Sequence, residues 1–401
     1  MHTLTIPQAR QFLLQKQGLI GQYIFHGKEG AMAYIRQTGC IQFDPVDLCG
    51  QNAQITLQSR VKGFSKNMLE DLLYKDRQLV DYPDKCLSII PTTDWPYFQR
   101  YRQAAIKGGQ RFQGLAALEA QALQHIQENG PVNSDELPLE GGIRWHSSIH
   151  WSGSGNSETK AGRAVLEQLY STGQLVIHHK KGTRKYYDLA ERHIPKEILQ
   201  APDPLPDDLE HQKWRVLRRI GAIGLLWNRP SDAWLYIQNL SAANRSDIFR
   251  ALQESGKIIP VTVEGITHTF YCHSQDLPLI ETVKQSPSLK PRCELIAVLD
   301  CFMWDRKIIK ALFGGYHFSW EIYTPAIKRK HGPYVLPLIY GGNFIGRVEP
   351  VRGSKNKALN VKNIWLEDGI KVTKKMQTAI DACLKRFAKF NDCNLIADYV
   401  I

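Results

Sequence analysis

Apolar side chains recur at helical spacing in several short segments of the chain. The clearest such segments are residues 5–16, 31–38, 115–127 and 160–171, and a glycine of the kind that ends helices follows each one closely. Segments of alternating apolar and polar residues, joined by short polar turns, occupy residues 173–189, 258–271 and 334–348. The pattern therefore predicts a chain of the α+β class, built from short helices and antiparallel hairpins.

The order helix, turn, helix and hairpin occurs twice in the middle of the chain. The first copy ends in a hairpin whose turn is the basic run 180–183, and the second ends in a hairpin that turns at residues 264–265. In the second copy the middle helix is expected around residues 231–238. This order is typical of the winged helix, in which the second helix enters a DNA groove and the hairpin touches the backbone. We therefore expect tandem winged-helix domains.

Composition and turn residues predict four regions. A proline-rich linker at residues 201–206 separates the two copies, and the last third of the chain is rich in strands. The regions are an N-terminal winged-helix-like region at 1–113, winged helices at 114–200 and 207–283, and a β-rich C-terminal region with a DNA-contacting hairpin at 284–401.

One extended segment carries candidate chemistry. Pro45 disfavours a helical conformation at the residue before it, so the chain is expected to run extended there. Successive side chains of an extended segment point to opposite faces, which directs Ile41 and Phe43 to the core and Gln42 and Asp44 to the other face. Two residues along a strand span roughly 6–7 Å, so this amide and carboxylate could hold one water between them.

A purely structural role for the same aspartate is equally open from these residues. Asp44 followed by Pro45 is a favourable start for a helix, with the aspartate as the N-cap, the proline in the first position and Asp47 in the first turn.

Charge and cysteine usage narrow the class of protein. The 401 residues carry a formal net charge of +12, which suits a polyanionic partner such as nucleic acid. Eight cysteines occur without a C-x-x-C pair, so neither a zinc site nor a disulfide framework is expected. No apolar run reaches the roughly 18 residues of a membrane span, and the N-terminus is unlike a signal peptide. We expect a cytoplasmic protein that does not contact a membrane.

With these parts in order, the chain resembles the YcaQ/AlkZ family of bacterial winged-helix DNA glycosylases over nearly its whole length. The shorter shared motifs lie at residues 41–44, 59–61, 130–132 and 186–189. The most specific one runs from residues 303–306 through 321–329 to 334–338. Departures from the family pattern occur at residues 82–85, where members often have Tyr-Trp-Ala-His, and at residues 299–301, where a Phe-Asp-Pro is usual. These departures put the range of substrates in doubt.

The resemblance implies a monofunctional DNA glycosylase with its domains arranged around a DNA-binding cleft. Its substrates would be cationic alkylated purines, such as N7-alkylguanine and N3-alkyladenine, and interstrand crosslinks that it unhooks during DNA repair. Gln42 and Asp44 match the family's Gln-φ-Asp catalytic pair, in which φ is apolar. No metal or other cofactor is expected. The partner would be double-stranded DNA containing alkylated or crosslinked purines, bound by a monomer in the bacterial cytoplasm, at the nucleoid.

Basic residues on predicted hairpins and loops are candidates for phosphate contacts. They are Lys180, Lys181, Arg184, Lys328, Arg329, Lys330 and Arg347.

The chemistry of such substrates requires few catalytic groups. An N7- or N3-alkylated purine is already positively charged, so it can leave without being protonated first. One carboxylate could then stabilise the oxocarbenium-like sugar and activate a water, which an amide could orient. Two alternatives remain: a non-enzymatic winged-helix transcription regulator, in which Asp44 is only a cap, and a nucleoside hydrolase that acts on small molecules.

Overall fold

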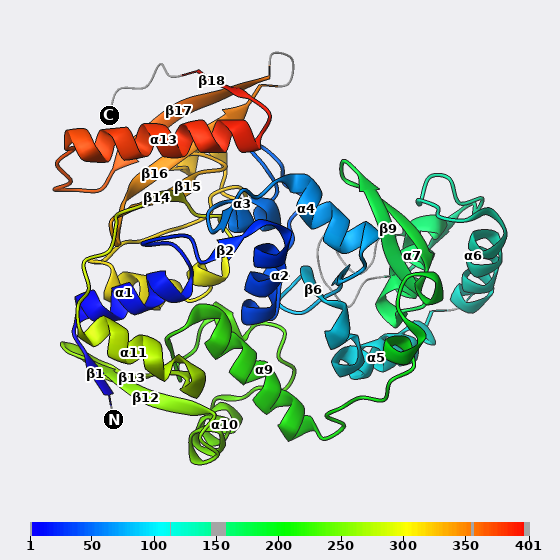
Figure 1. Cartoon of the computed structure of the whole chain (residues 1–401). Coiled ribbons are helices and arrows are strands. Elements are labelled where there is room, and N and C mark those ends of the chain that lie inside the picture. The colour runs from blue at the N-terminus through cyan, green and yellow to red at the C-terminus, as the bar shows by residue number, and fades with distance from the viewer. Residues whose placement is uncertain (1, 113, 146–157, 354–356, 397–401) are drawn as a thin grey trace. The chain divides into compact units, whose positions relative to one another are not determined.

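The computed structural model describes residues 2–112, 114–145, 158–353 and 357–396, and the chain divides into two compact units (Figure 1). The first unit combines Met1–Leu69 with Gln212–Ile401, and the second is Glu70–His211. The second unit is therefore inserted into the sequence of the first. These boundaries divide the predicted region 1–113 after Leu69, and the four predicted regions stay a prediction.

The first unit is a mixture of helices and sheets, as the sequence predicts. Its helices are α1 (Ile6–Lys16), α2 (Gly27–Thr38), α3 (Asn52–Gln58), α10 (Ala242–Glu254), α11 (Leu277–Lys284), α12 (Arg306–Leu312) and α13 (Lys374–Phe390), with α4 (Lys66–Glu70) and α9 (Asp208–Ile223) crossing its boundaries. Its short strands are β2 (Phe25–His26), β3 (Ile41–Gln42) and β4 (Val61–Lys62). None of the helices in the described part of the chain is long and apolar enough to span a membrane.

Two larger sheets complete this unit. One has the order β1-β12-β13-β11, from strands β1 (His2–Leu4), β12 (Ile258–Val263), β13 (Ile266–His273) and β11 (Leu226–Trp227). The other has the order β14-β15-β16-β17-β18, from strands β14 (Cys293–Leu295), β15 (Leu336–Tyr340), β16 (Asn343–Arg352), β17 (Ala358–Leu366) and β18 (Asn394–Ile396). Helix α13 lies along this second sheet and buries its apolar face, including Leu384 and Phe387 (Figure 1).

The second unit contains the first helix, turn, helix and hairpin series. Its helices are α5 (Gln99–Gly109), α6 (Leu115–Asn129), α7 (Ala161–Thr172) and α8 (Lys196–Leu199). Its strands are β5 (Leu79–Asp81), β6 (Ser88–Pro91), β7 (Gly142–Ile143), β8 (Thr159–Lys160), β9 (Leu175–Lys181) and β10 (Arg184–Leu189). Helix α7 is the central element, because it packs against both α5 and α6.

Local signals in the sequence explain where several elements begin and end. Thr5 and Gln8 form a capping box at the start of α1, in which the Gln8 amide donates 3.3 Å to the Thr5 hydroxyl and the Gln8 side chain accepts 2.9 Å from the Thr5 amide. Gly39 ends α2 with φ of 75°, a conformation that costs least for glycine. The predicted C-terminal ends of these two helices are confirmed, but α2 begins at Gly27 rather than at the predicted residue 31.

The prediction of a helix over residues 231–238 is wrong in its length. Only a single 3-10 turn, Asp232–Trp234, forms there, although Ser231 caps it as expected. Tyr236 has φ of 65° and Asn239 has φ of 55°, so the backbone leaves the helical region directly after the turn. The long helix in this part of the chain is α10 instead.

The core of the first unit contains a buried ion pair. One Arg60 Nη donates 2.6 Å to Asp300 Oδ1, and neither side chain is exposed to solvent. The other Nη donates 2.8 Å to the Thr56 carbonyl and 2.7 Å to the Ser59 hydroxyl, both near the end of α3. The guanidinium therefore joins α3 to the segment before α12, 240 residues later in the chain.

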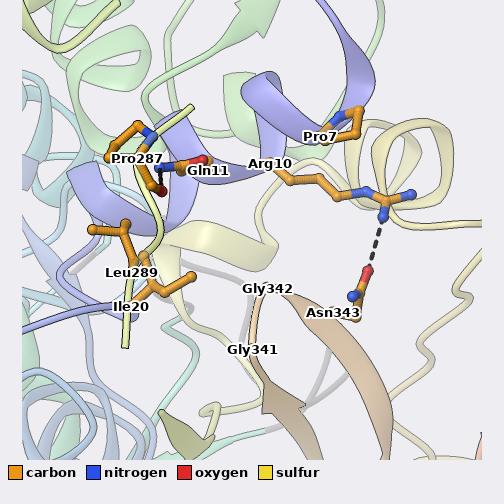
Figure 2. Close-up of a pocket in the computed structure, with 9 residues that line it drawn as sticks. All are labelled: Pro7, Arg10, Gln11, Ile20, Pro287, Leu289, Gly341, Gly342 and Asn343. Atoms are coloured by element: carbon orange, nitrogen blue, oxygen red, sulfur yellow. Dashed lines mark hydrogen bonds between the residues drawn. The ribbon is translucent and has the colours of Figure 1, made fainter. Parts of the chain in front are cut away.

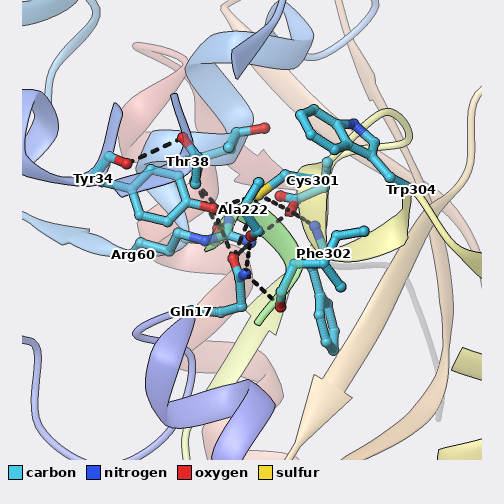
Figure 3. Close-up of polar contacts among 12 residues, drawn as sticks. Gln17, Tyr34, Thr38, Arg60, Ala222, Cys301, Phe302 and Trp304 are labelled. Atoms are coloured by element: carbon cyan, nitrogen blue, oxygen red, sulfur yellow. Dashed lines mark hydrogen bonds and ion pairs between the residues drawn. The ribbon is translucent and has the colours of Figure 1, made fainter. Parts of the chain in front are cut away.

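Neutral polar groups extend this contact to α1, α2 and α9. Tyr34 donates 2.8 Å to the Gln17 side-chain carbonyl, and its hydroxyl lies 2.9 Å from Cys301 Sγ. The Gln17 amide donates 2.7 Å to the Ala222 carbonyl in α9 (Figure 3). Five segments of the chain thus meet at one buried polar cluster, namely the end of α1, α2, the end of α3, α9 and the segment before α12.

We expect Arg60→Met to lower the free energy of unfolding by about 3–5 kcal/mol, because it leaves the Asp300 carboxylate buried without its cation. Adding Asp300→Asn to the same chain should restore part of the loss, since no charge then remains to be desolvated. Urea denaturation at pH 7 measures both effects. Arg250→Met is the control, because Arg250 forms an exposed pair with Asp247 at 3.2 Å, and such pairs contribute about 1 kcal/mol at most. Equal losses for Arg60→Met and Arg250→Met would contradict a structural role for the buried pair.

Candidate active site

Residues 41–44 follow α2 and are buried on both faces. Ile41 and Phe43 are 1% and 8% exposed, as predicted, but Gln42 and Asp44 are also only 4% and 2% exposed. The strand itself is short, since β3 ends at Gln42. The fold therefore covers both faces of this segment.

Asp44 is not a helix cap. Its Oδ1 accepts 2.9 Å from the Val46 amide, which is a local turn contact, and the next helix, α3, begins only at Asn52 after the cap Gln51. The structural alternative drawn from Asp44 and Pro45 is therefore wrong. Pro45 still acts as expected in one respect, since the chain does not become helical there.

Asp44 differs from the other buried carboxylates of the first unit. Within the described part of the chain, four buried carboxylate oxygens have no hydrogen-bond partner, and they belong to Asp44, Asp276, Glu294 and Asp300. The last three residues each form an ion pair through their other oxygen, with Lys16, Arg292 and Arg60 respectively. Asp44 has only the Val46 amide at its other oxygen. It is the one member of this set whose charge no basic side chain offsets.

The protonation of Asp44 reflects this environment. Burial raises the pKa of the Asp44 carboxyl, and the hydrogen bond from Val46 opposes the rise only in part. The charge of Asp44 also affects the pKa of two tyrosines. Burial raises the pKa of Tyr323 and of Tyr334, and the negative charge of Asp44 adds to both shifts. The Tyr334 hydroxyl is buried and makes no hydrogen bond with any described residue. Both phenols therefore lie near the carboxylate.

A single asparagine fixes the backbone of the motif. The Asn52 amide donates 2.9 Å to the Gln42 carbonyl, and its side-chain oxygen accepts 2.9 Å from the Leu299 amide. Asn52 is fully buried. Through this one side chain, α3 holds the motif strand against the segment that supplies Asp300.

The loop after Asp44 is held by two distant contacts and one local contact. Asp47 pairs with Arg352 of β16 at 3.1 Å and also accepts 2.8 Å from the Gly50 amide. The Asn391 amide, just after α13, donates 2.9 Å to the Cys49 carbonyl. The irregular segment between β3 and α3 is thus attached to the C-terminal sheet and helix.

The three predicted phosphate contacts in the second unit differ in their surroundings. Lys180 forms an ion pair with Asp81 at 2.6 Å and is mostly buried. Lys181 is exposed and lies 4.8 Å from the centre of the Tyr186 ring. Arg184 is exposed, with a carboxylate of Asp135 at 3.8 Å. Lys181 and Arg184 are thus the more accessible of the three.

The four predicted contacts in the first unit divide in the same way. Lys328 and Lys330 are exposed. Arg329 instead donates 2.7 Å to the Thr324 carbonyl within its own loop. Arg347 is 8% exposed and pairs with Glu367 at 2.5 Å. The fold therefore uses the guanidinium groups of Arg329 and Arg347 internally.

Sequence reasoning missed Asn52, Tyr323 and Tyr334 as neighbours of the motif. Tyr323 and Tyr334 lie in the long C-terminal stretch that carries the resemblance, so their positions were a usable signal. The sequence contained no such signal for Asn52. Its side chain connects the backbones of Gln42 and Leu299, and Leu299 is 247 residues away from Asn52.

One pocket of the first unit lies between α1 and the β15–β16 turn and does not coincide with the motif. Figure 2 shows Arg10 donating 2.8 Å to the Asn343 side chain across this cavity of about 250 Å³. Its other lining residues are Pro7, Gln11, Ile20, Pro287, Leu289, Gly341 and Gly342. The lining contains no carboxylate, histidine or cysteine, so it offers no group for acid–base or nucleophilic chemistry.

One group of side chains has the composition of a metal site. His178, Asp188 and His193 place one ligand atom each within 4.8 Å of one another in the second unit. Asp188 is already engaged, by His193 at 2.7 Å and by Arg192 at 2.9 Å. The arginine neutralises the carboxylate, so the geometry fits a structural cluster better than a cation site.

Comparison with known proteins identifies the class. A family model described as DNA glycosylase AlkZ-like matches residues 35–390. The protein is a DNA glycosylase, an enzyme of DNA repair, which excludes the non-enzymatic alternative. The chain belongs to the AlkZ-like DNA glycosylase family. Its structure is similar to that of the Streptomyces sahachiroi DNA glycosylase AlkZ, with a TM-score of 0.62 and 13% identity over 99% of this chain and 100% of that chain. At this identity the likeness shows the fold.

We expect Asp44→Asn to raise the melting temperature at pH 7. Because burial raises the pKa of Asp44, the folded protein binds this proton more tightly than the unfolded chain, and stability falls as pH rises through the two pKa values. Asparagine keeps the acceptor for Val46 and removes the charge. The gain should shrink as pH falls through the raised pKa, which thermal melts between pH 4 and 8 can follow. The exposed Asp368→Asn is the control, and an equal gain in both variants would contradict the assignment.

Proposed function

We propose that this glycosylase hydrolyses the N-glycosidic bond of cationic alkylated purines and unhooks interstrand crosslinks, with Asp44 and Gln42 as its catalytic residues. The observation that carries the proposal is the Asp44 carboxylate, which is buried, has one oxygen without a protein partner and is offset by no basic side chain. A buried carboxylate without a compensating cation does not stabilise the fold, so a catalytic role explains the presence of Asp44 better than a structural one.

In this mechanism Asp44 acts on the sugar side of the bond. As the base leaves, the deoxyribose becomes oxocarbenium-like, and a fixed negative charge beside it stabilises the transition state. The same carboxylate can take a proton from the attacking water. A pKa raised by burial makes it a stronger base than an exposed aspartate.

Gln42 supports Asp44 in this mechanism. A side-chain amide both donates and accepts, so it can orient a water between itself and Asp44. The contact from Asn52 to the Gln42 carbonyl holds the backbone of this residue in place. Asn52 is therefore a positioning residue for the proposed pair.

DNA binding is the other half of the proposal. The series α6, α7 and β9–β10, and the series α9, α10 and β12–β13, are proposed as two winged helices that a monomer places around duplex DNA. Lys181, Arg184, Lys328 and Lys330 are the proposed phosphate contacts that are exposed. Lys180 can join them by exchanging its carboxylate partner for a phosphate, whereas Arg329 and Arg347 act more through the fold.

The experiment that tests the catalytic assignment is the single-turnover release of N7-methylguanine from duplex DNA. We expect Asp44→Asn to lower the rate by roughly 10²–10⁴-fold, the usual contribution of a positioned acid–base group. Affinity for the same DNA should be unchanged or slightly higher, because the substitution removes a charge that repels phosphate. Gln42→Ala should have a smaller effect. Loss of DNA binding together with activity would show that Asp44 has a structural role only.

Substrate charge gives a second, independent test. A lone carboxylate cannot protonate a leaving base, so excision should follow the positive charge that alkylation has already placed on the purine. We expect fast release of N7-methylguanine and N3-methyladenine, and little or no release of uracil, hypoxanthine or 1,N6-ethenoadenine. Single-turnover rates on duplexes that differ only in this base measure the effect. Comparable rates on uracil and N7-methylguanine would overturn the charge argument.

A further inference from the structure

The loop that joins α12 to β15 carries the two most exposed large apolar side chains among those described. Ile327 is 94% exposed and Tyr323 is 77% exposed, whereas the next, Ile24, is 58% exposed. Single exposed apolar residues are common on protein surfaces. Here, however, Tyr323 and Ile327 lie four residues apart on one loop. The exposed Lys328 follows Ile327 directly, and the exposed Lys330 comes two residues later. We call residues 321–332 the Glu321 loop.

The base of the Glu321 loop is closed by one carboxylate. Glu321 is 9% exposed and accepts hydrogen bonds from the backbone amides of Lys330 and His331 at 3.0 Å and of Gly332 at 3.2 Å. Burial alone would raise the pKa of Glu321, but these three amides lower it below its usual range. The carboxylate therefore stays ionised and keeps the two ends of the loop together.

The interior of the loop is held as well. Arg329 donates 2.7 Å to the Thr324 carbonyl and 3.2 Å to the Ile322 carbonyl, so its side chain crosses the loop from one arm to the other. Ala326–Lys328 form a 3-10 turn, in which the Lys328 amide donates 2.8 Å to the Pro325 carbonyl. The tip is thus formed in advance, and an insertion by Ile327 would lose little conformational entropy.

The Glu321 loop also lies next to the proposed catalytic carboxylate. Partial desolvation and the charge of Asp44 raise the pKa of Tyr323, and both residues belong to the first compact unit. A duplex bound with a damaged nucleotide at Asp44 would therefore have this loop close to the lesion. Lys328 and Lys330 give the tip a positive charge that matches the phosphates on either side of a groove.

We infer that Ile327 is a wedge, which inserts between base pairs of duplex DNA beside the damaged nucleotide, with Tyr323 packed against the exposed face of a base. Apolar side chains of this kind unstack a base step and bend the duplex, and an aromatic ring adds a stacking surface. A crosslinked base is tied to both strands and cannot swing out of the helix. Local unstacking by a wedge exposes its glycosidic bond without extrusion. This inference rests on the proposed function.

The test compares Ile327→Ala with the conservative Ile327→Leu and with Ile24→Ala, an exposed isoleucine elsewhere in the first unit. The probe is a duplex with N7-methylguanine and 2-aminopurine at the neighbouring position, whose fluorescence rises when the base is unstacked. We expect binding of the intact enzyme, Ile327→Leu and Ile24→Ala to raise the signal, and Ile327→Ala to lose most of it. The salt dependence of binding should stay the same in Ile327→Ala, because no phosphate contact is removed.

The rate of base release separates a wedge from a purely structural residue. On the fully paired duplex we expect Ile327→Ala to be roughly tenfold slower, the loss expected when unstacking is no longer assisted. On a duplex with a mismatch beside the lesion, where stacking is already disrupted, the difference should fall below about twofold. Equal signals and rates for Ile327→Ala and Ile24→Ala on both duplexes would overturn the wedge while the enzyme remains active. If the intact enzyme releases no N7-methylguanine from either duplex, the proposed function itself fails.

Discussion

The first unit depends on the buried ion pair between Arg60 and Asp300. Two opposite charges without solvent exposure are stable only if their remaining hydrogen-bonding groups are also satisfied, and Arg60 meets this condition by binding the Thr56 carbonyl and the Ser59 hydroxyl. The end of α3 is thereby fixed to the segment before α12. At its other end, α3 is fixed to the same segment by Asn52, which also binds the Gln42 backbone. Both ends of one short helix therefore determine where the motif strand and its carboxylate lie.

Asp300 and Asp44 are both buried, but only the charge of Asp300 is compensated by a basic side chain. Asp300 is buried and compensated by Arg60, so it contributes to the fold. Asp44 is buried to a similar degree, but its carboxylate accepts a hydrogen bond only from the Val46 amide, and burial raises its pKa. An uncompensated carboxylate costs stability, and its charge also affects the pKa of Tyr323 on the exposed Glu321 loop. Stability lost at Asp44 is thus consistent with a group kept for catalysis.

The motif and the Glu321 loop are both held in place by contacts of individual side chains. Asp47, Cys49 and Asn52 attach the irregular chain after Asp44 to β16, α13 and the segment at Leu299. The Glu321 carboxylate and the Arg329 side chain close a loop that has little regular secondary structure. Both segments are therefore rigid without long helices or strands. Such preformed segments suit the proposed wedge, because distorting a stiff duplex costs free energy.

The sequence by itself determined the class of the fold, the positions of most helices and hairpins, and the family. Caps such as Thr5, helix-ending glycines such as Gly39 and the paired strands β12 and β13 depend on interactions between near neighbours, which a sequence displays directly. The tertiary structure alone decided the roles of the charged residues. Asp44 looked like a helix cap, and Arg329 and Arg347 looked like phosphate contacts, until the fold showed their contacts with Val46, Thr324 and Glu367. Only the fold shows that Arg60 compensates the charge of Asp300 and that no basic side chain does the same for Asp44. The physical reason is that compensation of a buried charge depends on groups that are distant in sequence, and only the folded chain brings them together.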